Sequence, residues 1–113
     1  MKILKNNQII CNNVYLANNP IKRLIGLLGK KEFCESDGVL LCPCSQIHSF
    51  GMQFSFDAIY LDSEYKIIAL YENIKKNRIL PYKHSAKNVL ELPLGTIKNK
   101  KLEPGDELKL IEA

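Results

Sequence analysis

The sequence predicts an α+β domain that is mostly β: a small closed or half-open antiparallel β-barrel with one main α-helix near residues 20–28. Three observations favour this fold. The chain has 113 residues, which is the size of one domain, so we treat residues 1–113 as a single unit. Many short apolar runs are separated by turn residues, as in β-rich domains. Only one segment repeats its apolar residues at helical spacing.

Three short strands are predicted at the start of the chain. Residues 2–5 and 8–11 are rich in apolar side chains and flank Asn6-Asn7. Asparagine tolerates the positive φ of a tight turn, so these two strands are expected to form a hairpin. A third strand is predicted at residues 14–17.

The predicted helix follows Asn19, which suits the N-cap, and has Pro20 in its first position. Gly29 suits the left-handed conformation that ends many helices. Between them, apolar residues recur at helical spacing, at Ile21, Leu24, Ile25 and Leu28.

The middle of the chain is predicted to be extended. A short strand at 39–41 precedes residues 48–56, in which large side chains occupy every second position. That spacing predicts an extended segment with one apolar face, made of His48, Phe50, Met52, Phe54 and Phe56. Two further strands, at 58–61 and 65–71, are expected to pair as an antiparallel hairpin.

The last third of the chain predicts two strands around one helical turn. Residues 87–92 form a strand that Pro93 and Gly95 end. A single helical turn is predicted within 95–101, and the last strand within 107–111.

The charge balance argues against several classes of partner. Lysine and arginine outnumber Asp and Glu by 16 to 12, a net charge of only +4. Along the sequence, basic residues do not alternate with aromatic ones as they do in proteins that bind single-stranded nucleic acid.

No apolar run approaches the roughly 20 residues that span a bilayer, and the first residues turn polar too soon for a signal peptide. We therefore expect a cytoplasmic protein with no nucleic-acid partner and no membrane partner.

The cysteine cluster, Cys42, Cys44 and His48, is the sharpest candidate for chemistry. Alternate residues of an extended chain point to the same side, so two thiolates and an imidazole could face one metal ion. Cys34 or His84 could be a fourth ligand only if the fold brings it close. The alternative is that both cysteines are small apolar residues beside a proline turn.

A second candidate is the His48 surface, which we define as His48, Met52, Asp57 and Glu91. His48 begins the apolar face of residues 48–56 and could anchor a ligand there. Asp57 and Glu91 interrupt apolar strands, where a carboxylate either serves a site or faces solvent. The structural alternative is a core face of aromatic residues with charged groups at its rim.

Five segments in this order resemble the DUF192 family, a prokaryotic domain of unknown function. They are RLIGLLGK at 23–30, IHSFGM at 47–52, DAIYLD at 57–62, VLELPLGT at 89–96 and LEPGD at 102–106. The resemblance implies a small, mostly-β fold and no established activity. Many relatives are exported and have tryptophan where this chain has Gly51, so a role inferred for that tryptophan does not transfer.

Three functional hypotheses remain open from the sequence. The leading one is a non-catalytic module that binds a small molecule, a glycan or a protein segment on the His48 surface. The second is a metal- or thiol-dependent enzyme that uses the cysteine cluster. The third is a structural or assembly partner without a pocket. The sequence names no cofactor, since it has no phosphate loop and no Gly-x-Ser-x-Gly elbow.

Overall fold

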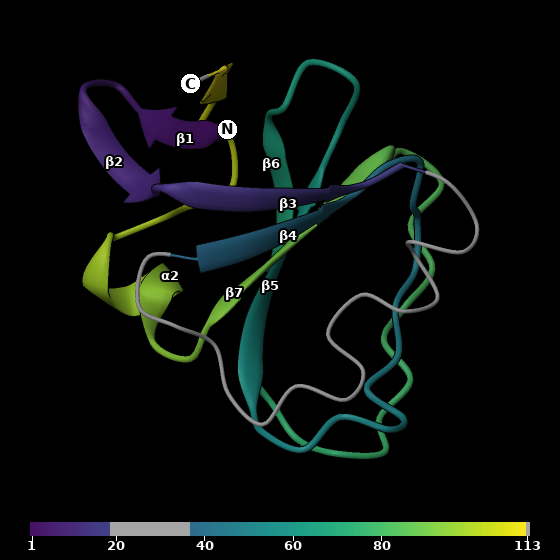
Figure 1. Ribbon diagram of the computed structural model, residues 1–113. Helices are drawn as coiled ribbons and strands as arrows, with labels where there is room; N and C mark the ends of the chain where they lie inside the picture. The colour runs from purple at the N-terminus through teal and green to yellow at the C-terminus, as the bar shows by residue number, and fades with distance from the viewer. Residues whose placement is uncertain (19–36, 113) are drawn as a thin grey trace.

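The computed structural model describes residues 1–18 and 37–112 (Figure 1). The helix predicted near residues 20–28 lies outside the described residues. The described elements are β1 (Lys2–Lys5), β2 (Gln8–Cys11), β3 (Asn13–Ala17), β4 (Asp37–Leu41), β5 (Phe56–Leu61), β6 (Ile67–Ile74), β7 (Asn88–Pro93), α2 (Thr96–Asn99) and β8 (Leu108–Ile111). The prediction of a mostly-β fold is confirmed, and these strands lie close to the ranges predicted for them.

The smaller sheet has three strands in the order β2-β1-β8. β1 and β2 form the predicted antiparallel hairpin, and Asn6 in its turn has a φ of 54°. β8 pairs antiparallel with the other edge of β1, which brings the two ends of the chain together (Figure 1).

The larger sheet has five strands in the order β3-β4-β7-β5-β6. β5 and β6 form the second predicted hairpin. All six residues of β5 are buried, as its continuous apolar run suggested. β3 and β4 pair in parallel, while the other neighbours in the sheet are antiparallel.

The described strands form two separate sheets and not the predicted barrel. The two sheets remain separate, and β3 and β6 are the two outer strands of the larger one. A barrel would require these edges to pair with each other or with the smaller sheet. An isolated bridge between Lys66 and Glu107 connects the sheets locally but does not close them.

The larger sheet packs on both faces, which accounts for its continuous apolar runs. We call one side the sandwich face; its side chains, Leu40, Ile59, Leu61, Leu90 and Leu92, share a core with Ile3 and Ile10 of the smaller sheet. We call the other side the loop face; its side chains are Val39, Phe56, Ala58, Tyr60 and Val89. Ile47, Met52, Leu80 and Ala86, from the segments between strands, pack against the loop face.

The prediction of one extended apolar face over residues 48–56 is wrong. His48 makes one isolated bridge, with Ile79, and the regular strand begins only at Phe56. Phe50 and His48 are exposed, whereas Ser49 between them is fully buried. The chain then turns through Gly51, at a φ of 83°. The alternation fails because the Ser49 hydroxyl hydrogen-bonds to a neighbouring loop, which turns its large neighbours outward.

Candidate functional site

Glu91 is the most unusual side chain of the loop face. It lies in the middle of β7, between Val39 of β4 and Ala58 of β5, and only 6% of it is exposed. Its carboxyl group has no hydrogen bond and no ion pair with the described part of the chain. Burial raises its pKa to about 8, so the carboxyl is mostly protonated near neutral pH.

The surroundings of Glu91 are aromatic and apolar. Strand register places Tyr15, Val39, Glu91, Ala58 and Tyr71 in one row across the sheet. Tyr60, nearby on the same face, donates its hydroxyl to the carbonyl oxygen of Pro81 at 2.9 Å, and burial raises its pKa to about 12. These neighbours provide low polarity around the carboxyl and few groups that could stabilise a negative charge.

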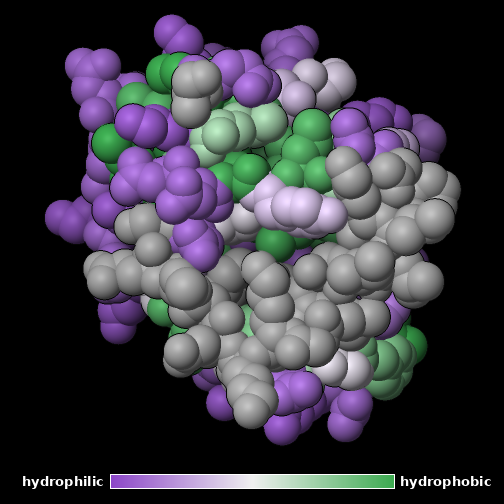
Figure 2. All heavy atoms as spheres, in the orientation of Figure 1, coloured by the Kyte–Doolittle hydropathy of each residue, from purple (hydrophilic) through white to green (hydrophobic). Residues whose placement is uncertain are grey.

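An open pocket of about 320 Å³ lies over β3 and β4, at one end of this row. Its lining consists of Met1, Asn13, Val14, Tyr15, Asp37, Gly38 and Val39. Glu91 does not line the pocket, but its cross-strand neighbour Val39 does. Tyr15 is 45% exposed, and the described part of the face in Figure 2 mixes hydrophobic with hydrophilic residues.

Asp57 lies next to Glu91 in the sheet but is oriented to the other face. It is fully buried, and its two carboxylate oxygens accept three backbone hydrogen bonds. One oxygen binds the amide of Asn73 at 3.0 Å, and the other binds the amides of Gly95 and Ile97 at 3.1 and 3.0 Å. Because Gly95 cannot cap α2 with a side chain, Asp57 supplies that acceptor from β5. These are the contacts of a carboxylate that holds the fold together.

The other two members of the His48 surface are also separated. Met52 is buried in the loop-face core, on the same side of the sheet as Glu91. The ring of His48 is exposed and lies 5.3 Å from that of Phe50, whose amide donates to His48 Nδ1. The structure thus brings Met52 and Glu91 to one face, directs Asp57 to the other, and leaves His48 at the surface.

The cysteine cluster begins at the end of β4. The amide of Cys42 donates to the carbonyl oxygen of Ala17, and the thiol of Cys44 donates to that of Gln46 at 3.2 Å. Within residues 1–18 and 37–112, no three His, Cys, Asp or Glu side chains are placed to hold one metal ion. Cys34 lies outside the described residues, and His84 is exposed. The metal hypothesis stays a prediction, which elemental analysis of untagged protein can check.

Sequence reasoning overlooked two residues that the structure makes important. The alternation over residues 48–56 predicts Ser49 on the polar side, yet Ser49 is buried and its hydroxyl hydrogen-bonds to Lys75 and Arg78. Tyr15 was part of a short strand with no assigned role, yet it lines the pocket. No local pattern distinguishes either residue, because both roles depend on which segments become neighbours.

Comparisons with known proteins agree on one family. The family model of DUF192, described as "Uncharacterized ACR", matches residues 2–110. A UPF0127 protein of Pyrococcus abyssi is 40% identical over 101 residues, covering 87% of this chain and 86% of that protein. A UPF0127 protein of Pyrococcus horikoshii is 34% identical over 101 residues, covering 85% of each chain.

Two crystal structures share the fold at low sequence identity. A protein of unknown function from Novosphingobium aromaticivorans has a TM-score of 0.82 and 16% identity, covering 96% of this chain and 82% of that one. A candidate transcription regulator from Sinorhizobium meliloti has a TM-score of 0.80 and 22% identity, covering 96% and 89% of the two chains. At these identities the likeness shows the fold alone.

Proposed function

The chain belongs to the DUF192 family, and from that premise we propose that it is a non-catalytic module that binds a small neutral molecule on the loop face, beside Glu91. The observation that carries this proposal is Glu91, which is only 6% exposed and whose carboxyl oxygens have no hydrogen-bond partner within the described residues but are not fully sealed from solvent. A carboxyl group in that position destabilises the fold unless something else satisfies it.

The protonation of Glu91 defines the chemistry of the ligand. With its pKa raised to about 8, the group presents one O–H donor and one carbonyl acceptor near neutral pH. A hydroxyl, amide or carbonyl group of a neutral ligand matches this pair, because it can accept from the acid and, where it carries a hydrogen, donate to it. An anionic ligand would meet the ionised carboxylate at higher pH and be repelled.

The neighbouring groups favour a ligand of modest size. The pocket over β3 and β4 has a volume of about 320 Å³ and exposes the ring of Tyr15. Such a mixture of one aromatic wall and a few polar groups is common in sites for small molecules. Met52 would contribute apolar contact from the loop side, whereas Asp57 and His48 have no part in this site.

The test is a fragment screen by amide NMR, using neutral compounds that carry hydroxyl, amide or carbonyl groups. We expect the compounds that bind to shift signals of β3, β4 and β7. Their affinity should fall at least about tenfold between about pH 6 and pH 9, as Glu91 ionises. Glu91→Gln should remove most of that pH dependence, because a neutral amide keeps one donor and one acceptor.

The matched control is Glu64→Gln, which changes an exposed carboxylate and should bind like the wild type. If compounds bind Glu91→Leu as tightly as the wild type, the carboxyl has no role in recognition. Shifts confined to other parts of the chain would likewise contradict the proposed site.

A further inference from the structure

Two loops that are distant in the sequence meet at one side of the larger sheet. The amide of Leu80 donates to the carbonyl oxygen of Ile47 at 3.0 Å. The amide of Ser49 donates to the carbonyl oxygen of Arg78 at 2.9 Å. His48 and Ile79 form the bridge between these hydrogen bonds. The segments around residues 48 and 79 therefore form a short antiparallel ribbon outside the regular sheet.

Ser49 fixes this ribbon from beneath. Its hydroxyl accepts a hydrogen bond from the amide of Arg78 at 2.8 Å and donates one to the carbonyl oxygen of Lys75. Asn77, within the turn so held, has a φ of 60°, which asparagine tolerates better than most residues. The buried serine thus sets an aromatic residue, Phe50, beside a turn of basic residues.

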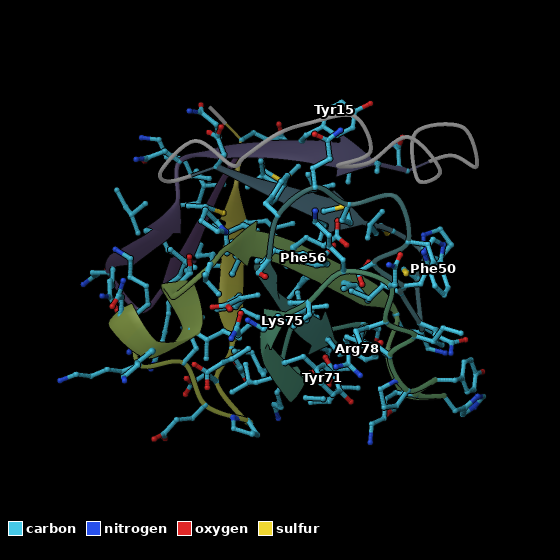
Figure 3. The ribbon with its side chains drawn as sticks, turned by 90° about the horizontal axis from the view of Figure 1, so that it is seen from below. Tyr15, Phe50, Phe56, Tyr71, Lys75 and Arg78 are labelled. Atoms are coloured by element: carbon cyan, nitrogen blue, oxygen red, sulfur yellow. The ribbon has the colours of Figure 1, made fainter. Side chains whose placement is uncertain are left out.

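The two joined segments expose both aromatic rings and cations. We define the basic-aromatic surface as Phe50, Lys75, Lys76, Arg78, Tyr82 and Lys83, all of which are exposed. Phe50 and Tyr82 are 44% and 61% exposed, which is high for aromatic side chains. Figure 3 shows Phe50 at the rim of the molecule, apart from Tyr15 on β3.

The two segments that carry this surface contain basic residues but no acidic ones. Residues 42–56 and 73–88 contain five of the sixteen lysines and arginines and none of the twelve acidic residues. The rest of the chain has eleven basic and twelve acidic side chains, so it has almost no net charge. None of the five cations takes part in an ion pair with another described residue.

We propose that the basic-aromatic surface binds single-stranded nucleic acid. Phosphates would pair with the cations, and unstacked bases would stack on the exposed rings, which is how proteins hold single strands without reading their sequence. The linear sequence shows no alternation of basic and aromatic residues, which is why it predicted no such partner. Folding creates that arrangement by joining two segments. An acidic peptide would satisfy the charges but gain little from the exposed rings, so it is the weaker alternative.

The experiment measures fluorescence anisotropy of labelled single-stranded oligonucleotides of thymidine and of uridine, titrated with the full chain at about 50 mM salt. We expect saturable binding that weakens steeply as salt increases. Phe50→Leu, which keeps apolar area but removes the ring, should weaken binding about 5- to 100-fold. Phe50→Tyr, which keeps an aromatic ring, should bind the oligonucleotides as tightly as the wild type. Because Phe50 is largely exposed, both variants should keep the wild-type melting temperature.

Charge is tested with a matched pair of double variants. Lys75→Gln with Arg78→Gln should weaken binding at least about tenfold and reduce the salt slope by about 1.4. Lys98→Gln with Lys109→Gln removes the same charge at exposed sites elsewhere and should change affinity less than about threefold. Equal losses in the two variants would overturn the proposal.

Competitors decide between the classes of partner. Polyglutamate of equal length should compete poorly, because it offers charge without bases. Equal competition by polyglutamate, or binding to anionic phosphatidylglycerol vesicles without binding to the oligonucleotides, would overturn the proposal. An unchanged affinity of Phe50→Leu would also do so, because stacking would then be absent.

Discussion

Replacing Asp57 tests whether this carboxylate maintains the fold, as its contacts indicate. Its oxygens accept hydrogen bonds from the amides of Asn73, Gly95 and Ile97, and the side chain is fully buried. Asp57→Ala removes the acceptor for all three donors. We expect the edge of β6 and the start of α2 to loosen together, because one side chain binds both.

The expected loss in the free energy of unfolding follows from the number of hydrogen bonds that Asp57 accepts. A hydrogen bond to a charged group contributes about 1.5–3 kcal/mol, and contributions within one cluster do not add fully. Three lost bonds therefore predict a decrease of about 3–6 kcal/mol in the free energy of unfolding. This is a large part of the roughly 5–15 kcal/mol typical of a domain, and corresponds to a melting temperature lower by about 10–20 °C. Asp57→Asn keeps one acceptor and should lose about half as much.

The assay combines urea unfolding, followed by circular dichroism, with amide hydrogen exchange at Asn73, Gly95 and Ile97. Glu64→Ala, at an exposed carboxylate, is the control and should change stability by no more than about 0.5 kcal/mol. A loss below about 1 kcal/mol in Asp57→Ala, or three amides that remain protected, would refute the structural role.

Three further predictions follow from burial and packing. Burial raises the pKa of Glu91 from 4.5 to about 8, so the contribution of this group to stability should be largest below about pH 4.5 and should fall by up to roughly 5 kcal/mol as the pH rises from there through 8. Glu91→Gln should lack this pH dependence in urea unfolding, and an identical dependence in wild type and variant would contradict the prediction. Gly38→Ala should destabilise by about 1–3 kcal/mol, because its new Cβ would lie 3.2 Å from Cys11 Sγ and from Leu92 Cδ2, and a neutral effect in thermal melts would show that these neighbours yield. The thiol of Cys11, buried and with its pKa raised to about 12, should resist alkylation in the folded protein and react in urea, as mass spectrometry can determine; rapid labelling of folded protein would contradict this.

Local patterns were sufficient for most of the strands. The asparagine pair at residues 6–7 marked the first hairpin, and Asn6 adopts the positive φ expected there. The unbroken apolar run after Asp57 marked β5 as a strand covered on both faces. In these cases the signal and the structure involve the same few residues, so neighbours in the sequence determine the outcome.

Features that depend on distant segments were not accessible in this way. The residues of β3 and β4 do not indicate that these two strands pair in parallel. The larger sheet ends in two outer strands, β3 and β6, where a closed barrel was expected. Alternation over residues 48–56 predicts a strand, but hydrogen bonds from Ser49 to residues 75 and 78 hold the start of this segment in another conformation.

The two strand carboxylates illustrate the same limit at the candidate site. Asp57 and Glu91 both interrupt apolar runs, so the sequence marked both but could not distinguish them. Sheet register pairs Ala58 with Glu91 and Asp57 with Leu92, which places the two side chains on opposite faces. Asp57 then accepts hydrogen bonds from three amides, whereas Glu91 has no hydrogen-bond partner within the described residues.

The protonation state of Glu91 is the most direct test of the proposed site. Carbon-13 NMR can follow its side-chain carboxyl through a pH titration, with the signal assigned by its absence in Glu91→Gln. The structure predicts a midpoint near 8, so that the group is a hydrogen-bond donor at neutral pH. A midpoint near the ordinary value of 4.5 would mean a charged, satisfied carboxylate, and the proposed recognition of a neutral ligand would be wrong.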